Sequence, residues 1–219
     1  MLNLVIGEAA LELVPREIGR HPSVVKDARR RNLLPSQLLL DRSLHHHAML
    51  KLKEDEKRGR PDLVHLTVLS ITGTPLYMSG RVRVYIHTRD DLVLTLKERT
   101  RPPKSYARFR DLMQKSLADR PKTGLITVEE SSIAGLIDRI NGDLVIGFST
   151  QGKETTLQDV ALEVSASKNP MAVIGGFPKG HFDPKTVSRF DEMVRIHRDS
   201  LDAHVVAARL VYEIEKLES

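Results

Sequence analysis

The feature that most constrains the fold is a regular alternation of strand-like and helix-like segments over the second half of the chain. From Leu125 onward, short apolar runs alternate with stretches whose apolar residues have helical spacing. Strand–helix alternation of this length implies a parallel sheet covered by helices on both faces. The expected strands are 125–128, 143–148, 171–174 and 194–197, and the expected helices are 129–140, 156–165, 185–192 and 201–217.

The first half of the chain contains a second strand pattern. Residues 82–87 and 92–96 alternate in polarity around Arg89-Asp90-Asp91, which predicts an antiparallel hairpin. We also expect strands at 2–6 and 38–40, and helices at 8–14 and at 23–32, where Ser23 is the predicted cap. The chain has no linker rich in Gly, Pro or Ser and no internal repeat. This organisation predicts one α/β domain over residues 1–219, with the hairpin inserted or at the sheet edge.

The composition excludes several classes of function. The chain has 219 residues, 40% apolar and 29% charged, so we expect a substantial core. The absence of cysteine excludes disulfides, thiolate zinc sites and cysteine nucleophiles. Aromatic residues make up 4% with no Trp, which argues against a broad base-stacking platform. No signal peptide and no apolar run of about 18 residues is present, so a soluble cytoplasmic protein is expected.

The apolar run 171–174 ends at a glycine-rich turn that is the strongest candidate for a ligand site. Gly175, Gly176 and Gly180 follow the run, and such glycines allow sharp turns and close approach of a ligand to backbone N–H groups. In open α/β sheets, ligands bind just past the carboxyl ends of strands. The spacing is neither GxGxxG nor a P-loop, since Gly180 precedes His181. An ordinary strand-to-helix loop is the alternative.

The most basic segment of the chain is 97–110. It holds six Lys or Arg and one Glu, a net charge of +5 that equals the formal charge of the whole chain, so the remainder is balanced. Pro102-Pro103 predicts an extended arm, and a helix follows through Phe109 and Leu117. Such an arm, with Tyr106 and Phe109 nearby, suits contacts to phosphates and to one or two bases. A solvated loop without a partner is the alternative interpretation.

Two further groups of residues are candidates for function. His45-His46-His47 lacks the i, i+4 spacing and the carboxylate of a helical metal motif, so exposed helix-start or nucleic-acid contacts are favoured over metal binding. Pro61 and Asp62 after Arg60 are typical of a helix start, where an acidic residue complements the dipole. The last helix has two apolar rows, which predicts either a dimer interface or a deep position in the core.

Three motifs before the glycine-rich turn together resemble one family. They are Lys57-Arg58-Gly59-Arg60-Pro61-Asp62, Val84-Tyr85-Ile86-His87-Thr88 and Thr100-Arg101-Pro102-Pro103-Lys104-Ser105-Tyr106-Ala107-Arg108-Phe109. In this order they resemble the Nep family (also called Emg) of ribosome-biogenesis methyltransferases, which belong to the SPOUT class. The resemblance implies a SPOUT-type parallel sheet with a C-terminal trefoil knot, a homodimer, and S-adenosyl-L-methionine as methyl donor without a metal. The implied reaction is methylation of N1 of a pseudouridine in small-subunit ribosomal RNA.

The resemblance also implies site residues. The cofactor would contact three loops, formed by Phe148 and Ser149, by Gly175, Gly180, His181 and Phe182, and by Ile196, His197, Arg198, Asp199, Ser200 and Leu201. The implied RNA contacts are Arg60, Arg101, Lys104 and Arg108. Lys104 stands where the family often has Arg. The lysine keeps the positive charge but loses the bidentate hydrogen bonding of an arginine.

The chemistry of methyl transfer assigns provisional roles to Arg60 and Asp62. Loss of the proton from the pseudouridine nitrogen leaves negative charge that a fixed cation stabilises. We expect Arg60, held by Asp62, to be that cation. Asp62 is a weaker candidate for a general base, because its ordinary pKa near 3.9 lies far below that of the ring nitrogen. An RNA-binding assembly factor without catalysis is the alternative function, and a phosphate-binding metabolic enzyme is disfavoured because no phosphate fingerprint is present.

Overall fold

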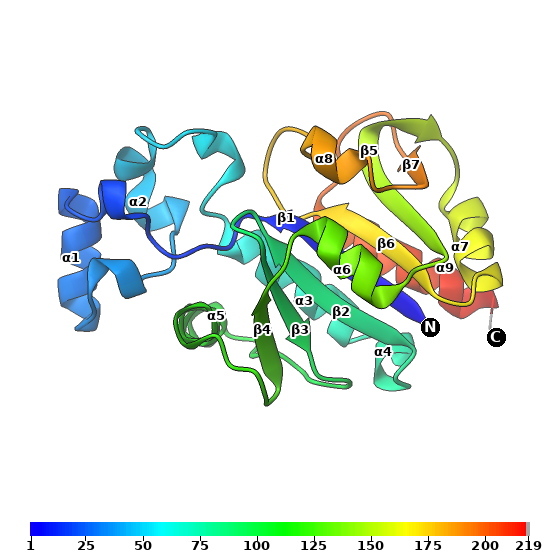
Figure 1. The fold of residues 1–219 in the computed structure, drawn as a ribbon, viewed down its shortest axis with the longest axis horizontal. Helices are drawn as coiled ribbons and strands as arrows, with labels where there is room; N and C mark the ends of the chain where they lie inside the picture. The colour runs from blue at the N-terminus through cyan, green and yellow to red at the C-terminus, as the bar shows by residue number, and fades with distance from the viewer. Residues whose placement is uncertain (218–219) are drawn as a thin grey trace.

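A computed structural model describes residues 1–217 of the chain and shows one seven-stranded sheet with helices on both faces (Figure 1). The strands are β1 (Leu2–Ala9), β2 (Val82–Thr88), β3 (Leu92–Leu96), β4 (Ile126–Glu130), β5 (Leu144–Glu154), β6 (Pro170–Gly175) and β7 (Glu192–Arg195). The α-helices are α1 (Pro22–Arg31), α2 (Arg42–Met49), α3 (Pro61–Thr72), α4 (Pro75–Met78), α5 (Tyr106–Asp119), α6 (Ile133–Ile140), α7 (Leu157–Ala166), α8 (Pro184–Val187) and α9 (Ala203–Leu217). Short 3-10 turns occupy Arg16–Ile18, Pro35–Gln37 and Asp55–Lys57.

The sheet is mixed rather than parallel. Its strand order is β4-β3-β2-β1-β6-β5-β7. Among the strands of the described chain, β3 alone points in the opposite direction to the others, so its pairs with β2 and β4 are antiparallel and the remaining pairs are parallel. The predicted hairpin is present as β2 and β3, but it is not an edge extension, because β2 pairs with β1 inside the sheet. The reason is burial: six of the seven β2 residues are buried, which an edge hairpin could not achieve.

Two apolar clusters cover the two faces of the sheet. One cluster packs α3, α5, α7 and α9 against it, and the other packs α6 and aromatic residues of the segment 177–190. In Figure 1, α6 lies in front of the sheet and α3 and α9 lie behind it. The predicted α/β layering is therefore confirmed. No helix among residues 1–217 has the length and apolar character needed to span a bilayer.

Residues 11–53 form a separate small unit, which we call the helical lobe. It contains α1 and α2 around its own apolar cluster, which runs from Val14 to Leu52. The lobe extends beyond one end of the sheet, at the left of Figure 1. A bidentate ion pair between buried Glu12 and Arg58 lies at its base, with an Nε–Oε1 distance of 2.9 Å.

The predicted helix at 8–14 is wrong. Strand β1 continues to Ala9, and the following residues pair with residues 38–40 through Val14 N–Leu38 O and Leu40 N–Glu12 O hydrogen bonds. The predicted strand at 38–40 is reduced to a single bridge between Leu13 and Leu39. Two apolar segments that are distant in sequence satisfy each other's backbone hydrogen-bonding groups here, and local helical spacing could not reveal this pairing.

Three other boundaries differ from the predictions. Helix α6 begins only at Ile133, because 129–130 pair with β3 and Ser132 caps the helix through Gly135 N. The helix expected at 185–192 is the single turn α8, and Glu192 already belongs to β7. Strand β7 correspondingly ends at Arg195 rather than at residue 197.

The last helix occupies the deep position that was one of its two predicted roles. Val206, Leu210 and Ile214 are among its buried residues, and α9 packs against both α3 and α7. The other apolar row is only partly buried, and Tyr212 is exposed. The core position is thus confirmed for one row of α9.

Candidate functional site

The sheet topology places the starts of the three predicted cofactor loops side by side. In the order β6-β5-β7, Phe148 of β5 is in register with Ile174 of β6 and with Val194 of β7. Strands β6 and β7 end next to this register, at Gly175 and Arg195, whereas β5 continues to Glu154 through a bulge that begins after Phe148. Gly175, Ser149 and Ile196 therefore follow one another across this edge. This is the edge at which open α/β sheets bind ligands.

A small pocket lies between two of these loops. It has a volume of about 70 Å³, its floor contains buried Phe148, Val194 and Val206, and its rim holds the remaining side chains. Six predicted cofactor residues besides Phe148 line this pocket: Ser149, Ile196, His197, Asp199, Ser200 and Leu201. Small-molecule sites usually start at about 300 Å³, so this pocket is smaller than a nucleoside-sized ligand requires.

Backbone N–H groups in this loop are available to a ligand. The amides of Ser200 and Leu201 make no hydrogen bond to any group of residues 1–217, whereas the Asp199 amide donates to His197 Nδ1 at 3.1 Å. Arg198 does not line the pocket, and its side chain points to Asp199. Ser200 is exposed and Leu201 is half-buried, so both amides are accessible to water or to a ligand at the pocket rim.

The glycine-rich turn contributes backbone at the strand edge, but its end turns to the other face of the sheet. Phe182 is buried against Phe177 and Phe190, with ring centroids 5.3 Å from each. Lys57 donates to the His181 carbonyl, and the His181 side chain is exposed. Gly180 has φ +89°, a conformation that favours glycine. Gly180, His181 and Phe182 are therefore not lining residues of the small pocket.

Arg60 and Asp62 form a bidentate ion pair at the start of α3. The Nε–Oδ1 distance is 2.8 Å and the Nη2–Oδ2 distance is 2.7 Å, with both side chains more than a third exposed. Burial opposes ionisation of Asp62, but the hydrogen bond and charge of Arg60 dominate and lower its pKa. The pair keeps the Arg60 guanidinium charged and oriented, and a carboxylate with a lowered pKa is a poor general base.

The backbone connects Arg60 directly to the glycine-rich turn. Arg60 N donates to Ala10 O at 3.1 Å, and Ala10 N donates to Gly176 O at 2.8 Å. Asp202, just past the loop 196–201, also interacts electrostatically with the Arg60 guanidinium. Sequence reasoning did not identify Ala10 or Asp202, because only the fold brings them to this position.

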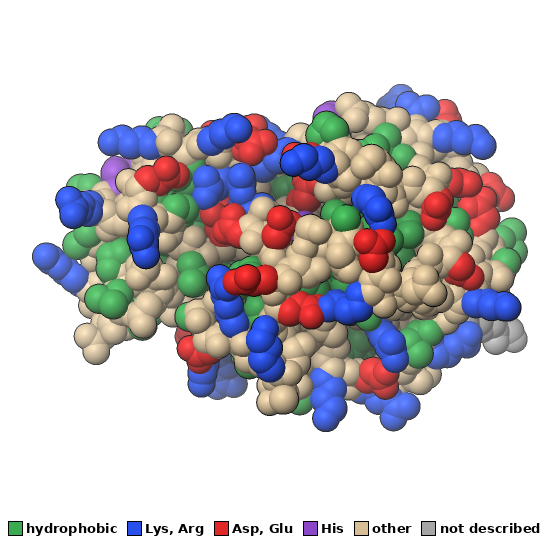
Figure 2. All heavy atoms as spheres, viewed as in Figure 1, with side chains coloured by type: hydrophobic (Ala, Val, Ile, Leu, Met, Phe, Trp, Pro, Cys, Tyr) green, Lys and Arg blue, Asp and Glu red, His purple; other side chains and the backbone are tan. Residues whose placement is uncertain are grey.

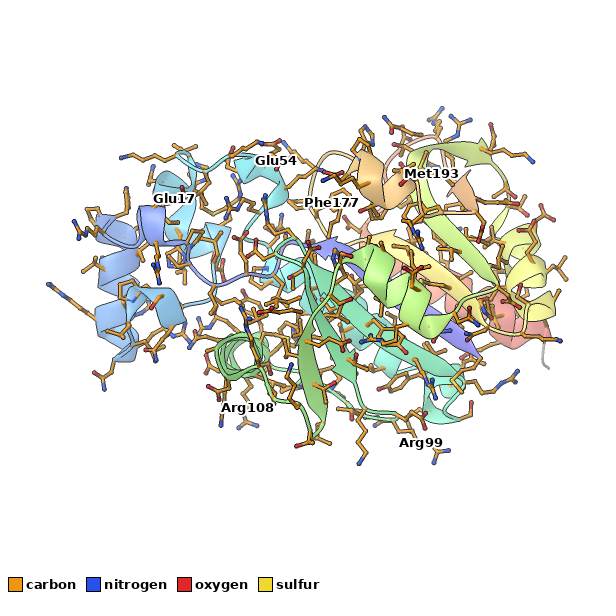
Figure 3. All side chains as sticks on the ribbon, in the orientation of Figure 1. Glu17, Glu54, Arg99, Arg108, Phe177 and Met193 are labelled. Atoms are coloured by element: carbon orange, nitrogen blue, oxygen red, sulfur yellow. The ribbon has the colours of Figure 1, made fainter. Side chains whose placement is uncertain are left out.

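The basic arm presents its predicted RNA contacts to solvent. Arg101, Lys104 and Arg108 are exposed, and Figure 3 shows Arg99 and Arg108 pointing away from the molecule along its lower edge. Arg101 also lines a largely apolar groove of about 440 Å³, together with Pro102, Pro103 and Leu125.

Three hydrogen bonds hold the arm and its helix in place. His65 Nε2 lies 2.8 Å from Pro103 O, the Tyr77 hydroxyl donates to Thr100 O at 2.7 Å, and the Tyr106 hydroxyl donates to Asp41. Burial and the Asp41 carboxylate strongly raise the pKa of Tyr106, which stays protonated.

The expectation that Phe109 contacts a base is wrong. Its ring is 1% exposed and stacks on His65 at a centroid distance of 4.4 Å. The residue is part of the core because it follows the apolar face of α5, together with Met113 and Leu117.

The histidine run lies on α2, and its members differ in exposure. His45 is fully buried and its Nδ1 accepts from Asp41 N, which corrects the expectation of an exposed run, while His46 and His47 are exposed. No group of three metal-ligating side chains is found in the part of the chain that the structure describes. A charged cavity of about 350 Å³ also lies near α6 and α8, lined by Glu8, His87 and Lys185 among others, and it contains no predicted site residue.

Comparisons with known proteins agree with this arrangement. A family model described as EMG1/NEP1 methyltransferase matches residues 4–215. The chain is 36% identical over 224 residues to the ribosomal RNA small subunit methyltransferase Nep1 of Staphylothermus marinus, covering 99% of this chain and 96% of that one. It is 39% identical over 217 residues to the Nep1 protein of Pyrobaculum calidifontis, covering 97% and 96%.

A solved structure has the same fold. The crystal structure of Archaeoglobus fulgidus Nep1 bound to S-adenosylhomocysteine superposes with a TM-score of 0.86 at 34% identity, covering 99% of this chain and 98% of that one. From the family match, the full-length relatives and the shared fold, we conclude that this chain belongs to the EMG1/NEP1 methyltransferase family.

Proposed function

We propose that this protein is an S-adenosylmethionine-dependent methyltransferase of small-subunit ribosomal RNA, acting on N1 of a pseudouridine during ribosome biogenesis. The observation that carries the proposal is the backbone connection from Arg60 through Ala10 to Gly176. It joins the one predicted catalytic cation to the edge of the sheet where the ligand loops meet. A cation for the reacting base and amides for a cofactor thus belong to one site.

The residues at the small pocket fit an adenosine-type cofactor. The buried floor of Phe148, Val194 and Val206 is apolar, as an adenine ring requires, and the Ser200 and Leu201 amides are free to donate to ring nitrogens. Ser149, Ile196 and His197 would complete the rim. When bound, S-adenosylmethionine supplies a methyl group already activated as a sulfonium. The relative from A. fulgidus binds S-adenosylhomocysteine, which supports this assignment.

The protein's own contribution to catalysis is alignment and charge. Pseudouridine is joined to its ribose through carbon, so its N1 carries a proton and can accept a methyl group after losing it. Arg60, oriented by the two hydrogen bonds that it donates to Asp62, would stabilise the negative charge that develops on the ring. Asp62 acts by positioning Arg60, since its lowered pKa makes it a poor proton acceptor.

The basic arm would hold the RNA. Arg101, Lys104 and Arg108 are exposed cations on a segment whose backbone is anchored to His65 and Tyr77. Phosphate contacts of this kind position an RNA without reading its sequence. A rigidly held arm loses little conformational entropy on binding, which favours affinity.

We also propose the trefoil knot and the homodimer of the SPOUT class for this chain. The knot is supported by the path after edge strand β7, since the chain returns through 196–202 to place α9 against α3 and α7. The dimer is supported by exposed Leu66 on α3 and Tyr212 on the adjacent α9. In a sedimentation experiment we expect the native protein to be a dimer and the variant L66K/Y212K to be a monomer.

The experiment that tests the function measures methyl transfer to a small-subunit rRNA fragment containing pseudouridine at one position. Arg60→Ala should lower the transfer rate by about 10²–10³-fold with RNA affinity reduced much less, because a charge-stabilising donor acts mainly in the transition state. Arg60→Lys should recover part of the rate by restoring the charge. Arg139→Ala is the matched control, since Arg139 is another exposed arginine paired with a carboxylate, Glu129 on β4.

The outcomes separate the candidate functions. Equal loss of affinity and rate in Arg60→Ala would make Arg60 an RNA contact only. An undiminished rate would remove its catalytic role. If the native protein fails to bind S-adenosylhomocysteine in a calorimetric titration at millimolar ligand but binds the RNA, the assembly-factor alternative replaces the enzyme. The same RNA with uridine in place of pseudouridine must not be methylated, because N1 of uridine is bonded to ribose.

A further inference from the structure

The helical lobe is a second strongly basic region of this protein. Residues 11–53 contain nine Lys or Arg and four Asp or Glu, a formal net charge of +5. The chain outside the basic arm sums to zero only because the residues outside both regions carry an equal negative charge. Three of the four acids, Glu12, Asp27 and Asp41, are buried, and only Glu17 is exposed. The surface of the lobe is therefore more positive than its sequence charge. Figure 2 shows Lys and Arg side chains projecting from the lobe at the left.

Within the described chain, all exposed cations of the lobe except Arg30 lack partners, unlike many arginines elsewhere. Over most of the sheet domain, exposed arginines pair with carboxylates, as Arg120 does with Glu130 and Arg189 does with Asp138. Within residues 1–217, six exposed lobe cations form no side-chain hydrogen bond or ion pair: Arg16, Arg20, Lys26, Arg29, Lys51 and Lys53. Clustered like charges without partners destabilise a surface by mutual repulsion. Their presence is explained by an anionic ligand.

In the part of the chain that the structure describes, the acids that follow the lobe pair with only one of its cations, the half-buried Arg42. Glu54 pairs with Arg89 of the sheet domain, and Asp55 pairs with Arg42. On α1, Lys26 and Arg29 are three residues apart and lie on one face. Asp27, the acid between them, is buried and holds Arg30 at 2.8 Å. The exposed face of α1 is thus a cationic row.

The lobe is fixed beside the helix that carries the basic arm's Arg108. Arg31 at the end of α1 bonds Asp111 of α5 at 2.6 Å, and Tyr106 at the start of α5 donates to Asp41 of the lobe. Asp111 is three residues after Arg108, which places both on the same side of α5. The helical lobe and the helix that carries Arg108 are therefore held next to each other in a fixed relative position.

The residues of the lobe favour a particular part of the RNA. Residues 11–53 contain no Phe, Tyr or Trp, and their exposed rings are the small imidazoles of His46 and His47, so a broad platform for stacking unpaired bases is absent there. Long cationic side chains without aromatic partners bind the phosphates of a base-paired backbone. We infer that the helical lobe binds the phosphate backbone of an RNA duplex flanking the target nucleotide, as a contact surface separate from Arg60, Arg101, Lys104 and Arg108.

This inference rests on the proposed function, because it requires that the protein binds RNA. The test uses two RNAs: a short rRNA hairpin with the target loop, and the same hairpin with its stem extended by an arbitrary duplex. The lobe variant is R20Q/K26Q/R29Q, which leaves Arg30 and Arg31 in their contacts with Asp27. Affinity is measured as a function of salt concentration for each RNA.

The expected result is specific to the extended RNA. Each lost phosphate contact lowers the slope of log affinity against log salt by about 0.9, so three contacts lower it by roughly 2–3 and the affinity at 0.1 M salt on the order of 100-fold. The short hairpin should bind the lobe variant with nearly the same affinity as it binds the native protein. An unchanged unfolding midpoint confirms that the variant is folded.

The control variant is K153Q/K168Q/K185Q, which removes the same charge from exposed lysines outside the helical lobe and the basic arm. If it weakens binding to the extended RNA as much as the lobe variant does, net charge explains the effect and the inference is overturned. Equal loss on both RNAs would also overturn it, because the lobe would then contact the target hairpin. If the native protein binds neither RNA, the proposed function fails first.

Discussion

The ion pair between Glu12 and Arg58 allows a sharp test of how the helical lobe is held to the sheet domain. Both side chains are at least nine-tenths buried, and two hydrogen bonds of 2.9 and 2.5 Å join them. Removing one partner of such a pair leaves an uncompensated charge in the interior, at a cost of about 3–5 kcal/mol. Arg58→Met should therefore lower the free energy of unfolding by that amount and the melting temperature by roughly 6–20 °C.

The double variant and the pH dependence test the physical cause. Glu12→Met/Arg58→Met should be more stable than Arg58→Met alone, because it removes the unpaired carboxylate as well. Burial already raises the pKa of Glu12, opposed by Arg58, so without Arg58 its pKa rises further. A folded-state pKa above the unfolded value gives stability that is lost as pH rises, so the deficit of Arg58→Met should be larger at pH 8 than at pH 5.

The assay is equilibrium denaturation at one protein concentration, followed by circular dichroism. A buried, uncompensated Glu12 carboxylate is refuted as the cause if Arg58→Met costs less than about 1 kcal/mol, or if the double variant is less stable than the single one. Either result would mean that water or a rearranged lobe solvates Glu12 once the guanidinium is gone.

Two further predictions concern the glycine-rich turn and the buried histidines. A Cβ at Gly176 would lie 2.7 Å from an Ile6 side-chain carbon and 2.8 Å from Ala9 Cα, so Gly176→Ala should cost about 1–3 kcal/mol in stability and weaken S-adenosylhomocysteine binding; native values in denaturation and calorimetry would contradict this. Burial lowers the pKa of His45 and of His87, so below about pH 6.5 the unfolded chain binds protons that the folded protein does not. The free energy of unfolding should then fall with decreasing pH, by at most about 1.4 kcal/mol per pH unit for each histidine. A free energy of unfolding that stays constant from pH 7.5 to 5.5 would exclude this contribution of the histidines.

Strand ends and helix starts could be predicted from short windows of sequence. The apolar run before Gly175 and the Pro61–Asp62 helix start were both placed correctly, because their signals are local. The helix expected at 8–14 failed, since Ala9, Leu13 and Val14 have a spacing that also suits an irregular segment paired with a distant one. Whether Phe109 faces RNA or the core likewise depended on His65, which lies 44 positions earlier.

The sequence by itself determined the family, the strand that ends at Gly175, and the residue types needed for charge stabilisation and phosphate binding. Only the tertiary structure decided which of these residues meet. It separated Phe182 from the small pocket, joined Arg60 to Gly176 through Ala10, and set the basic helical lobe beside α5. The physical reason is that local conformational preference acts over a few residues, whereas burial and hydrogen-bond satisfaction select partners far apart in the chain.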